Sequence, residues 1–198
     1  NPDGSFDIEF PVEKPGYYSI SRNPLYLTPG DDMKMNIKEV PELSTFEGKG
    51  AEVNRYLSTR FYPKGGSYLS SGKYSFPDFG KTMQAIDSIM TKRRTELMAL
   101  KCTPEFRQLE EIRIKADMLQ SIYYYPNYNG RNVFPVNCTQ EEADKIKKHF
   151  FGGQKDVVEP ILQELVLSDA YIDIEVVRYV LLLYSCLLYT SDAADDKA

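Results

Sequence analysis

The sequence is poor in the residues that most often carry catalysis or bind metals. It contains no tryptophan, one histidine and three cysteines among 198 residues. With His149 alone, the chain lacks the pair of histidines that many zinc sites use. Cys102, Cys138 and Cys186 lie far apart, so no C-x-x-C motif can lower the pKa of one thiol beside another. The sequence therefore predicts no active site within this chain.

Basic residues are also in deficit, and long apolar runs are lacking. Lys and Arg number 24 against 29 Asp and Glu, which gives a net charge of −5 and an isoelectric point near 5.1. This balance disfavours nucleic acid and anionic membranes as partners. The apolar run at 180–188 falls far short of the roughly 20 residues that a membrane span needs. We therefore predict neither nucleic-acid binding nor a membrane span.

What the sequence does contain is a series of clear local signals between Tyr26 and Leu57. Pro29 and Gly30 suit the two central positions of a type II turn, because proline presets φ and glycine accepts a positive φ. A strand should therefore end just before this turn. Alternation and spacing of apolar residues then predict strands at 33–37 and 46–50 and a helix at 51–61.

Two further strands are predicted upstream, at 4–10 and 17–21, from alternating apolar and polar residues. Short strands at intervals of about ten residues are typical of an antiparallel sheet, here part of a sandwich. We therefore assign residues 1–62 to an antiparallel β domain that ends in a short helix.

The rest of the chain has helical spacing. After a loop or linker rich in Gly, Ser and Tyr at 63–77, one apolar stripe predicts a helix at 79–100. Thr103 and Pro104 are a cap and a first-turn proline, so a second helix starts at once and must fold back antiparallel. The region at 63–185 is thus expected to be helical and built on one long hairpin. The fold class is α+β: a truncated antiparallel sheet followed by helices.

The end of this hairpin and the following segments are less regular. Pro126 should end the second helix and leave 127–136 irregular. Thr139 and Glu142 form a capping box for a short helix that closes at Gly152-Gly153. Ser168 can cap a last helix with one apolar stripe at Ile172, Val176, Tyr179 and Leu183.

The turn-and-helix stretch resembles the N-terminal β-rich domain, of unknown function, that precedes the redox domain in TlpA-like thioredoxin-family proteins of the Gram-negative envelope. The residues that carry the resemblance are Tyr26-Leu27, Pro29-Gly30-Asp31, Phe46, Gly48, Gly50-Ala51, Asn54 and Tyr56-Leu57. It covers 1–62 well and the helices to about 185 loosely.

The resemblance implies a periplasmic or envelope protein, with a signal peptide or lipoprotein anchor upstream of Asn1 and no cofactor. Its parent would be a thiol-disulfide oxidoreductase, and its partner would be its own thioredoxin domain or another envelope redox protein. This chain departs from the family's activity, because the C-x-x-C dithiol is missing. It is thus expected to be a non-catalytic accessory domain.

Both ends of the chain suggest a fragment. The start has no methionine, and Asp3-Gly4 is typical of a hairpin turn that follows an upstream strand. At the other end, residues 186–198 resemble a translated sequencing adapter, so we predict a non-native or disordered tail. A naturally frayed terminus is the alternative.

An unusual density of tyrosine marks the end of the predicted hairpin. Tyr123, Tyr124, Tyr125 and Tyr128 could form a recognition patch, because tyrosine supplies a large contact area at low entropic cost. The alternative is that two of these rings face the core and the others cover it. Our second functional hypothesis is a stand-alone binding module that presents this tyrosine-rich patch, or a face of the sheet, to a protein or a glycan.

Four other groups have a simple structural interpretation beside a functional one. Cys102 and Cys138 could form a disulfide or stay separate thiols. Asp31-Asp32 could bind calcium, but no third carboxylate is near, and a turn role is preferred. His149 is expected at a helix C-terminus rather than in catalysis. The triplet at 92–94, Lys-Arg-Arg, should be a solvated helix face.

Overall fold

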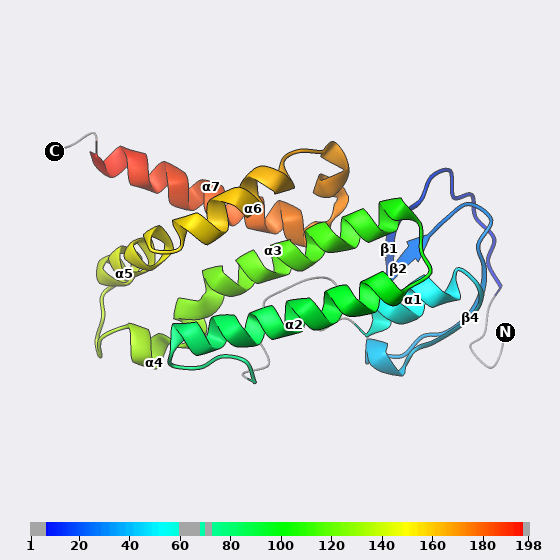
Figure 1. The fold of residues 1–198 in the computed structure, drawn as a ribbon, viewed down its shortest axis with the longest axis horizontal. Helices are drawn as coiled ribbons and strands as arrows, with labels where there is room; N and C mark the ends of the chain where they lie inside the picture. The colour runs from blue at the N-terminus through cyan, green and yellow to red at the C-terminus, as the bar shows by residue number, and fades with distance from the viewer. Residues whose placement is uncertain (1–6, 60–67, 70–72, 196–198) are drawn as a thin grey trace. The chain divides into compact units, whose positions relative to one another are not determined.

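The chain is α+β, with antiparallel strands followed by helices, as the sequence predicted. A computed structural model describes residues 7–59, 68–69 and 73–195. The backbone divides into two compact units, unit 1 at 1–63 and unit 2 at 64–198. Unit 1 holds the strands and helix α1, and unit 2 holds helices α2 to α7 (Figure 1).

Unit 1 is built from two β-hairpins and one helix. Its elements are β1 (Gly16–Ile20), β2 (Asn23–Leu27), β3 (Asp32–Asn36), the 3₁₀ turn η1 (Pro41–Leu43), β4 (Thr45–Lys49) and α1 (Ala51–Ser58). β1 pairs antiparallel with β2, and β3 pairs antiparallel with β4. The described strands thus form two separate two-stranded sheets, where the sequence suggested one.

The two hairpins share one apolar core. Its buried members are Leu25, Leu27, Phe46 and Ala51. Met33 and Met35 pack against this core while their neighbours in β3 face solvent, which confirms the predicted alternation. Hydrophobic burial therefore holds the hairpins together without a shared ladder of backbone hydrogen bonds.

The predicted turn between β2 and β3 is confirmed in detail. Gly30 has φ of 76°, and the Asp31 N–H donates to the Thr28 carbonyl at 3.1 Å. The Asp31 carboxylate also accepts from the Thr28 N–H and hydroxyl, both at 2.8 Å. Asp31 thus closes the turn through its side chain as well as its backbone.

Asn54 explains why β2 has no second strand beside it. Its carboxamide oxygen accepts from the Tyr26 N–H at 2.9 Å, and its nitrogen donates to the Tyr26 carbonyl at 3.1 Å. The side chain of one residue in α1 therefore takes the place of a neighbouring strand. Position 48 requires a glycine, because a Cβ there would lie 2.3 Å from the Asp32 carbonyl oxygen.

The predicted strand at 4–10 is not observed where the structure can test it. Residues 7–10 have no regular structure, and Ile8 and Phe10 are 67% and 47% exposed. The segment alternates apolar and polar residues as a strand would, but residues 7–10 have no partner strand. A lone strand gains no hydrogen bonds from a ladder. Residues 4–6 lie outside the described part of the chain.

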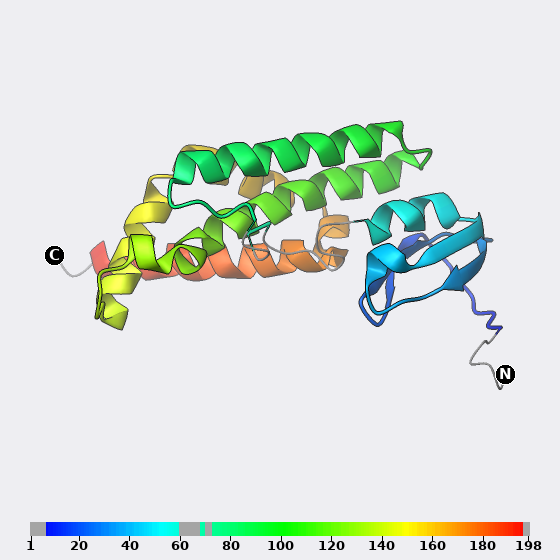
Figure 2. The same cartoon turned by 90° about the horizontal axis from the view of Figure 1, so that it is seen from below.

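The long helical hairpin of unit 2 is confirmed. Helix α2 spans Phe79–Ala99 and α3 spans Pro104–Tyr128, and the two lie side by side (Figures 1 and 2). The Thr103 hydroxyl accepts from the Phe106 N–H at 3.2 Å and caps α3. Arg94 of α2 binds Glu111 of α3 at 3.1 Å.

The remaining helices cover the hairpin. They are α4 (Gly130–Val133), α5 (Gln140–Gly152), α6 (Lys155–Leu165), the 3₁₀ turn η2 (Asp169–Asp173) and α7 (Glu175–Asp195). Thr139 and Glu142 form the predicted capping box of α5. Lys115 of α3 binds Glu164 of α6 at 2.5 Å, and α7 packs along α3 (Figure 2).

Three predictions about this region need correction. Pro126 lies inside α3, which continues to Tyr128, and α4 follows where an irregular stretch was expected. Ser168 caps η2 rather than the last helix, since its hydroxyl accepts from the Ala170 N–H. The core stripe of α7 therefore has a different register, and Ile172 and Tyr179 are exposed. The buried residues there are Ile174, Val176, Val177, Val180 and Tyr184.

The predicted linker is partly packed. Within 63–77, Tyr68 and Leu69 are buried, and the Tyr68 N–H donates to the Ser121 hydroxyl at 2.7 Å. These two residues belong to the core of unit 2. The backbone of α7 is helical to Asp195, within the segment predicted as a non-native or disordered tail.

Candidate functional site: the tyrosine cluster of unit 2

The four predicted tyrosines lie on the C-terminal half of α3 and face different directions. Successive residues of a helix point about 100° apart, so neighbours in sequence cannot share one face. Tyr125 is 3% exposed, Tyr123 and Tyr124 are half-buried, and Tyr128 is 44% exposed. The cluster therefore divides into an inner part and an outer part.

Tyr125 belongs to the core. Its ring stacks on Phe150 at 5.3 Å between centroids and meets the edge of Phe79 at 4.8 Å. Its hydroxyl donates to the Pro77 carbonyl at 2.7 Å. Burial, and next the charge of Asp78, raises the pKa of Tyr125. This side chain joins three segments and is not available to a partner.

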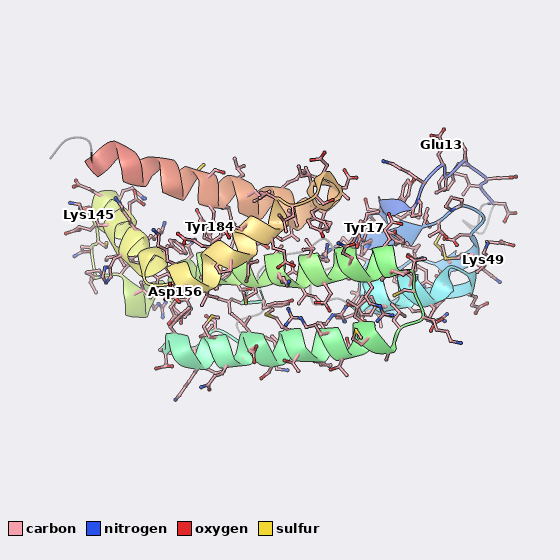
Figure 3. All side chains as sticks on the ribbon, turned by 45° about the horizontal axis from the view of Figure 1, so that its top comes forward. Glu13, Tyr17, Lys49, Lys145, Asp156 and Tyr184 are labelled. Carbon is pink, nitrogen blue, oxygen red and sulfur yellow. The ribbon has the colours of Figure 1, made fainter. Side chains whose placement is uncertain are left out.

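Tyr123 also has a structural role, at the junction of three helices. Its ring stacks on Phe151 of α5 at 5.3 Å and meets the edge of Tyr184 of α7 at 6.0 Å. Tyr184, labelled in Figure 3, donates from its hydroxyl to the Leu119 carbonyl at 3.2 Å. Burial raises the pKa of both phenols, so neither is an ionised nucleophile near neutral pH.

The outer part of the cluster is formed by Tyr124, Tyr128 and Tyr179, which we call the outer tyrosine face. The ring of Tyr124 lies parallel to that of Tyr179, at 6.4 Å, and meets the edge of Tyr128 at 6.2 Å. The hydroxyls of Tyr124 and Tyr179 share a hydrogen bond. Burial, and next this hydrogen bond, raises the pKa of Tyr124. The three rings of this face can stack on a ligand, and their hydroxyls can exchange hydrogen bonds with it.

Sequence reasoning placed one member of this face incorrectly. Tyr179 was assigned to the core stripe of the last helix, but it is 38% exposed. The predicted register assumed a helix that starts at Ser168, but α7 starts at Glu175 and buries Val177 and Val180, which leaves Tyr179 outside its buried face. The sequence did contain a signal, because Val176, Val177 and Val180 offer an alternative apolar stripe with Tyr179 outside it.

The cysteines and the histidine show no catalytic arrangement. Cys102 and Cys138 are present as thiols and not as a disulfide pair. Burial, and next the Glu142 carboxylate, raises the pKa of the Cys138 thiol, which is the reverse of what activates a nucleophile. His149 is exposed in the last turn of α5, as expected.

The predicted basic face at 92–94 is only partly solvated. Lys92 is exposed and lies near Glu96, but Arg93 is 8% exposed and binds Glu96 at 2.8 Å. Arg94 is in the interhelical ion pair with Glu111. This corrects the prediction of a solvated face, because Arg93 is buried and all three cations pair with carboxylates of α2 and α3.

A buried polar stripe on α3 was missed from the sequence. Its members are Glu110, Arg113, Asp117, Gln120 and Ser121, each at most 8% exposed. They recur at helical spacing, three or four residues apart, and so form one face. Polar residues at helical spacing usually mark the solvent-exposed face of a helix, so this spacing in the sequence does not by itself predict burial. Ser121, which binds the backbone of Tyr68 and Asp117, shows that the stripe helps to assemble the core.

Neither metal binding nor a membrane span finds support in the described residues. That part of the chain has no group of three or more His, Cys, Asp or Glu placed to hold a metal ion. Asp31 is instead a turn residue, as preferred. None of the helices it contains combines the length and hydrophobicity needed to cross a membrane.

The chain matches no protein-family model, no curated protein and no solved structure. The fold and the site define the class of protein. It is an α+β protein of two compact units, one built on two β-hairpins and the other a set of helices with an outer tyrosine face.

Proposed function

We propose that this chain is a non-catalytic accessory domain of an envelope thioredoxin-like thiol-disulfide oxidoreductase. In this proposal it positions a redox domain of the thioredoxin type, in the periplasm or cell envelope, and needs no cofactor. Its partner is that protein domain or another envelope redox protein.

The observation that carries the proposal is the role of the residues on which the resemblance rests. Asp31 closes a turn, Asn54 holds the edge of β2, and Gly48 allows a close backbone approach. Each specifies a backbone scaffold and none supplies a thiol, a base or a ligand. A motif of this kind suits a domain that positions another domain, while the chemistry lies elsewhere.

The proposal predicts that the chain alone reduces no disulfide. We expect reduction of insulin by dithiothreitol to proceed at the same rate with and without the chain. A variant with all three cysteines changed to serine is the control and should behave identically. Catalysis by the native chain that disappears in this variant would contradict the non-catalytic assignment.

The coding DNA provides the complementary measurement. If the chain accompanies a redox domain, reading the source DNA past the codon for Ser185 should reveal a continuing frame with a W-C-x-x-C motif. A frame that ends as written, without such a motif, would remove the basis for the redox assignment.

A second candidate function is a stand-alone binding module, and the exposure of Tyr128 favours it. We expect Tyr128→Ala to weaken binding to an extended peptide or an envelope glycan at least about tenfold, without loss of helical circular dichroism. Calorimetric titration against a panel of both ligand types measures this. Phe76→Ala removes an aromatic ring of similar exposure, 38%, and is the matched control. Equal affinities in all three proteins would exclude the outer tyrosine face as a binding site.

A further inference from the structure

The contact between Tyr124 and Tyr179 differs in geometry from the other tyrosine contacts around it. The two rings are 13° from parallel with centroids 6.4 Å apart, and their hydroxyls share a hydrogen bond. Tyr124 meets Tyr128 edge-on, at 67°. Tyr123 meets Tyr184 in the same way, at 68°. Edge-on contacts are ordinary aromatic packing, whereas the pair of Tyr124 and Tyr179 brings two hydroxyl-bearing edges together.

The shared hydrogen bond determines which atoms of the two rings are neighbours. Each hydroxyl oxygen is attached to Cζ, and the ring carbons on either side of Cζ are the ortho carbons, Cε1 and Cε2. Because the two hydroxyls are in contact and the rings are nearly parallel, an ortho carbon of Tyr124 is adjacent to one of Tyr179. In a biphenol joined at its ortho carbons, the two hydroxyls are likewise neighbours that share a hydrogen bond.

The two rings are accessible from solvent and are held in place by different helices. Tyr179 is 38% exposed and Tyr124 is half-buried. Their helices, α7 and α3, pack along each other (Figure 2), and the Tyr184 hydroxyl of α7 donates to the Leu119 carbonyl of α3. An oxidant in solution can therefore reach the pair, while helix packing keeps the two phenols together.

We propose that Tyr124 and Tyr179 are a modification site, at which peroxide and a peroxidase join the two rings into a dityrosine cross-link. Each phenol gives up one electron and one proton and becomes a tyrosyl radical. The two radicals combine in a carbon–carbon bond between the adjacent ortho carbons. The hydrogen on each of these carbons then moves to a phenol oxygen as a proton, which restores both aromatic rings. One hydrogen peroxide takes up the two electrons and two protons and leaves as two water molecules.

The cross-link joins α3 covalently to α7. It connects two residues that are 55 apart in the sequence, and it restricts the unfolded chain as a disulfide does. We expect the melting temperature of unit 2 to rise by roughly 5–15 °C after oxidation. The modification requires no partner domain, so it is independent of the accessory role proposed above.

Oxidation of the full chain with hydrogen peroxide and a haem peroxidase tests the proposal. The exposed Cys186 thiol is first alkylated, because thiols reduce tyrosyl radicals. Dityrosine fluorescence should appear, and the chain should lose two hydrogen atoms. Tryptic digestion should yield the peptide 116–131 linked to the peptide 179–197. Since the fold holds the two phenols together, the yield should not depend on protein concentration.

Tyrosine-to-phenylalanine variants identify the two partners. Tyr124→Phe and Tyr179→Phe each keep the ring and remove the phenol, and each should lower the yield of the linked peptides at least about tenfold. Tyr128→Phe is the matched control. It removes a phenol of the same face that is more exposed, 44%, but meets Tyr124 edge-on, and should change the yield by less than about twofold. Circular dichroism before oxidation checks that each variant is folded.

Three results would overturn the proposal. The linked peptides could be missing from the oxidised native chain. They could persist unchanged in Tyr179→Phe, since another tyrosine of the peptide 179–197 would then be the partner. Dityrosine could also form only between chains, which gel filtration would show as a product of twice the native mass.

Discussion

At the scale of single residues, Asn54 has the largest predicted effect on unit 1. Asn54→Ala leaves the buried N–H and C=O of Tyr26 without their partners. We expect the free energy of unfolding of unit 1 to fall by roughly 2–4 kcal/mol, since each unsatisfied buried group costs about 1–3 kcal/mol. Urea denaturation followed by tyrosine fluorescence measures this loss. Asn36→Ala, at an exposed asparagine of β3, should change stability by less than about 0.5 kcal/mol.

Which residues could be predicted from the sequence depends on the range of the forces involved. Gly30 and Asp31 were predicted correctly because their turn is held by atoms three residues apart. Arg93 and Tyr179 were not, because their environments depend on other residues and on where a helix begins. The clustering of Tyr123 to Tyr128 was visible in the sequence. Its division into core and surface required the positions of Phe150 and Phe151.

At the scale of elements, the sequence predicted helices well where their ends carry local signals. The cap at Thr103 and the capping box at Thr139 fixed the starts of α3 and α5. Internal prolines caused the errors. The sequence predicts a helix end at Pro126, where α3 continues, and it predicts no helix over α6, which contains Pro160. A proline removes one helical hydrogen bond, a cost that tertiary burial can offset.

The burial that offsets this cost is visible in both helices. Tyr125 and Pro126 are both buried in α3, whereas Pro160 itself is exposed and α6 is held by its buried Val158 and Leu165. The strand predicted at 4–10 is not formed at 7–10 because the alternating residues there have no neighbouring strand to pair with. Elements that depend on a distant partner are therefore the ones that a single sequence predicts least well.

At the scale of the whole molecule, the division into two compact units predicts two separate unfolding transitions. Asn54→Ala should lower the transition of unit 1 alone. Phe106→Ala removes a fully buried ring from α3 and should lower that of unit 2 alone, by about 3–5 kcal/mol. Differential scanning calorimetry, with far-ultraviolet circular dichroism to identify the helical unit, resolves the two.

The two variants control each other, because each should leave the other unit's transition unchanged. The helical signal should follow the transition that Phe106→Ala lowers, since unit 2 contains helices α2 to α7. If both variants shift one common transition, the units unfold cooperatively and the division into two is not thermodynamic. Independent transitions would instead mean that unit 1, stabilised by Asn54, folds without depending on the folding of unit 2. An accessory domain requires this independence.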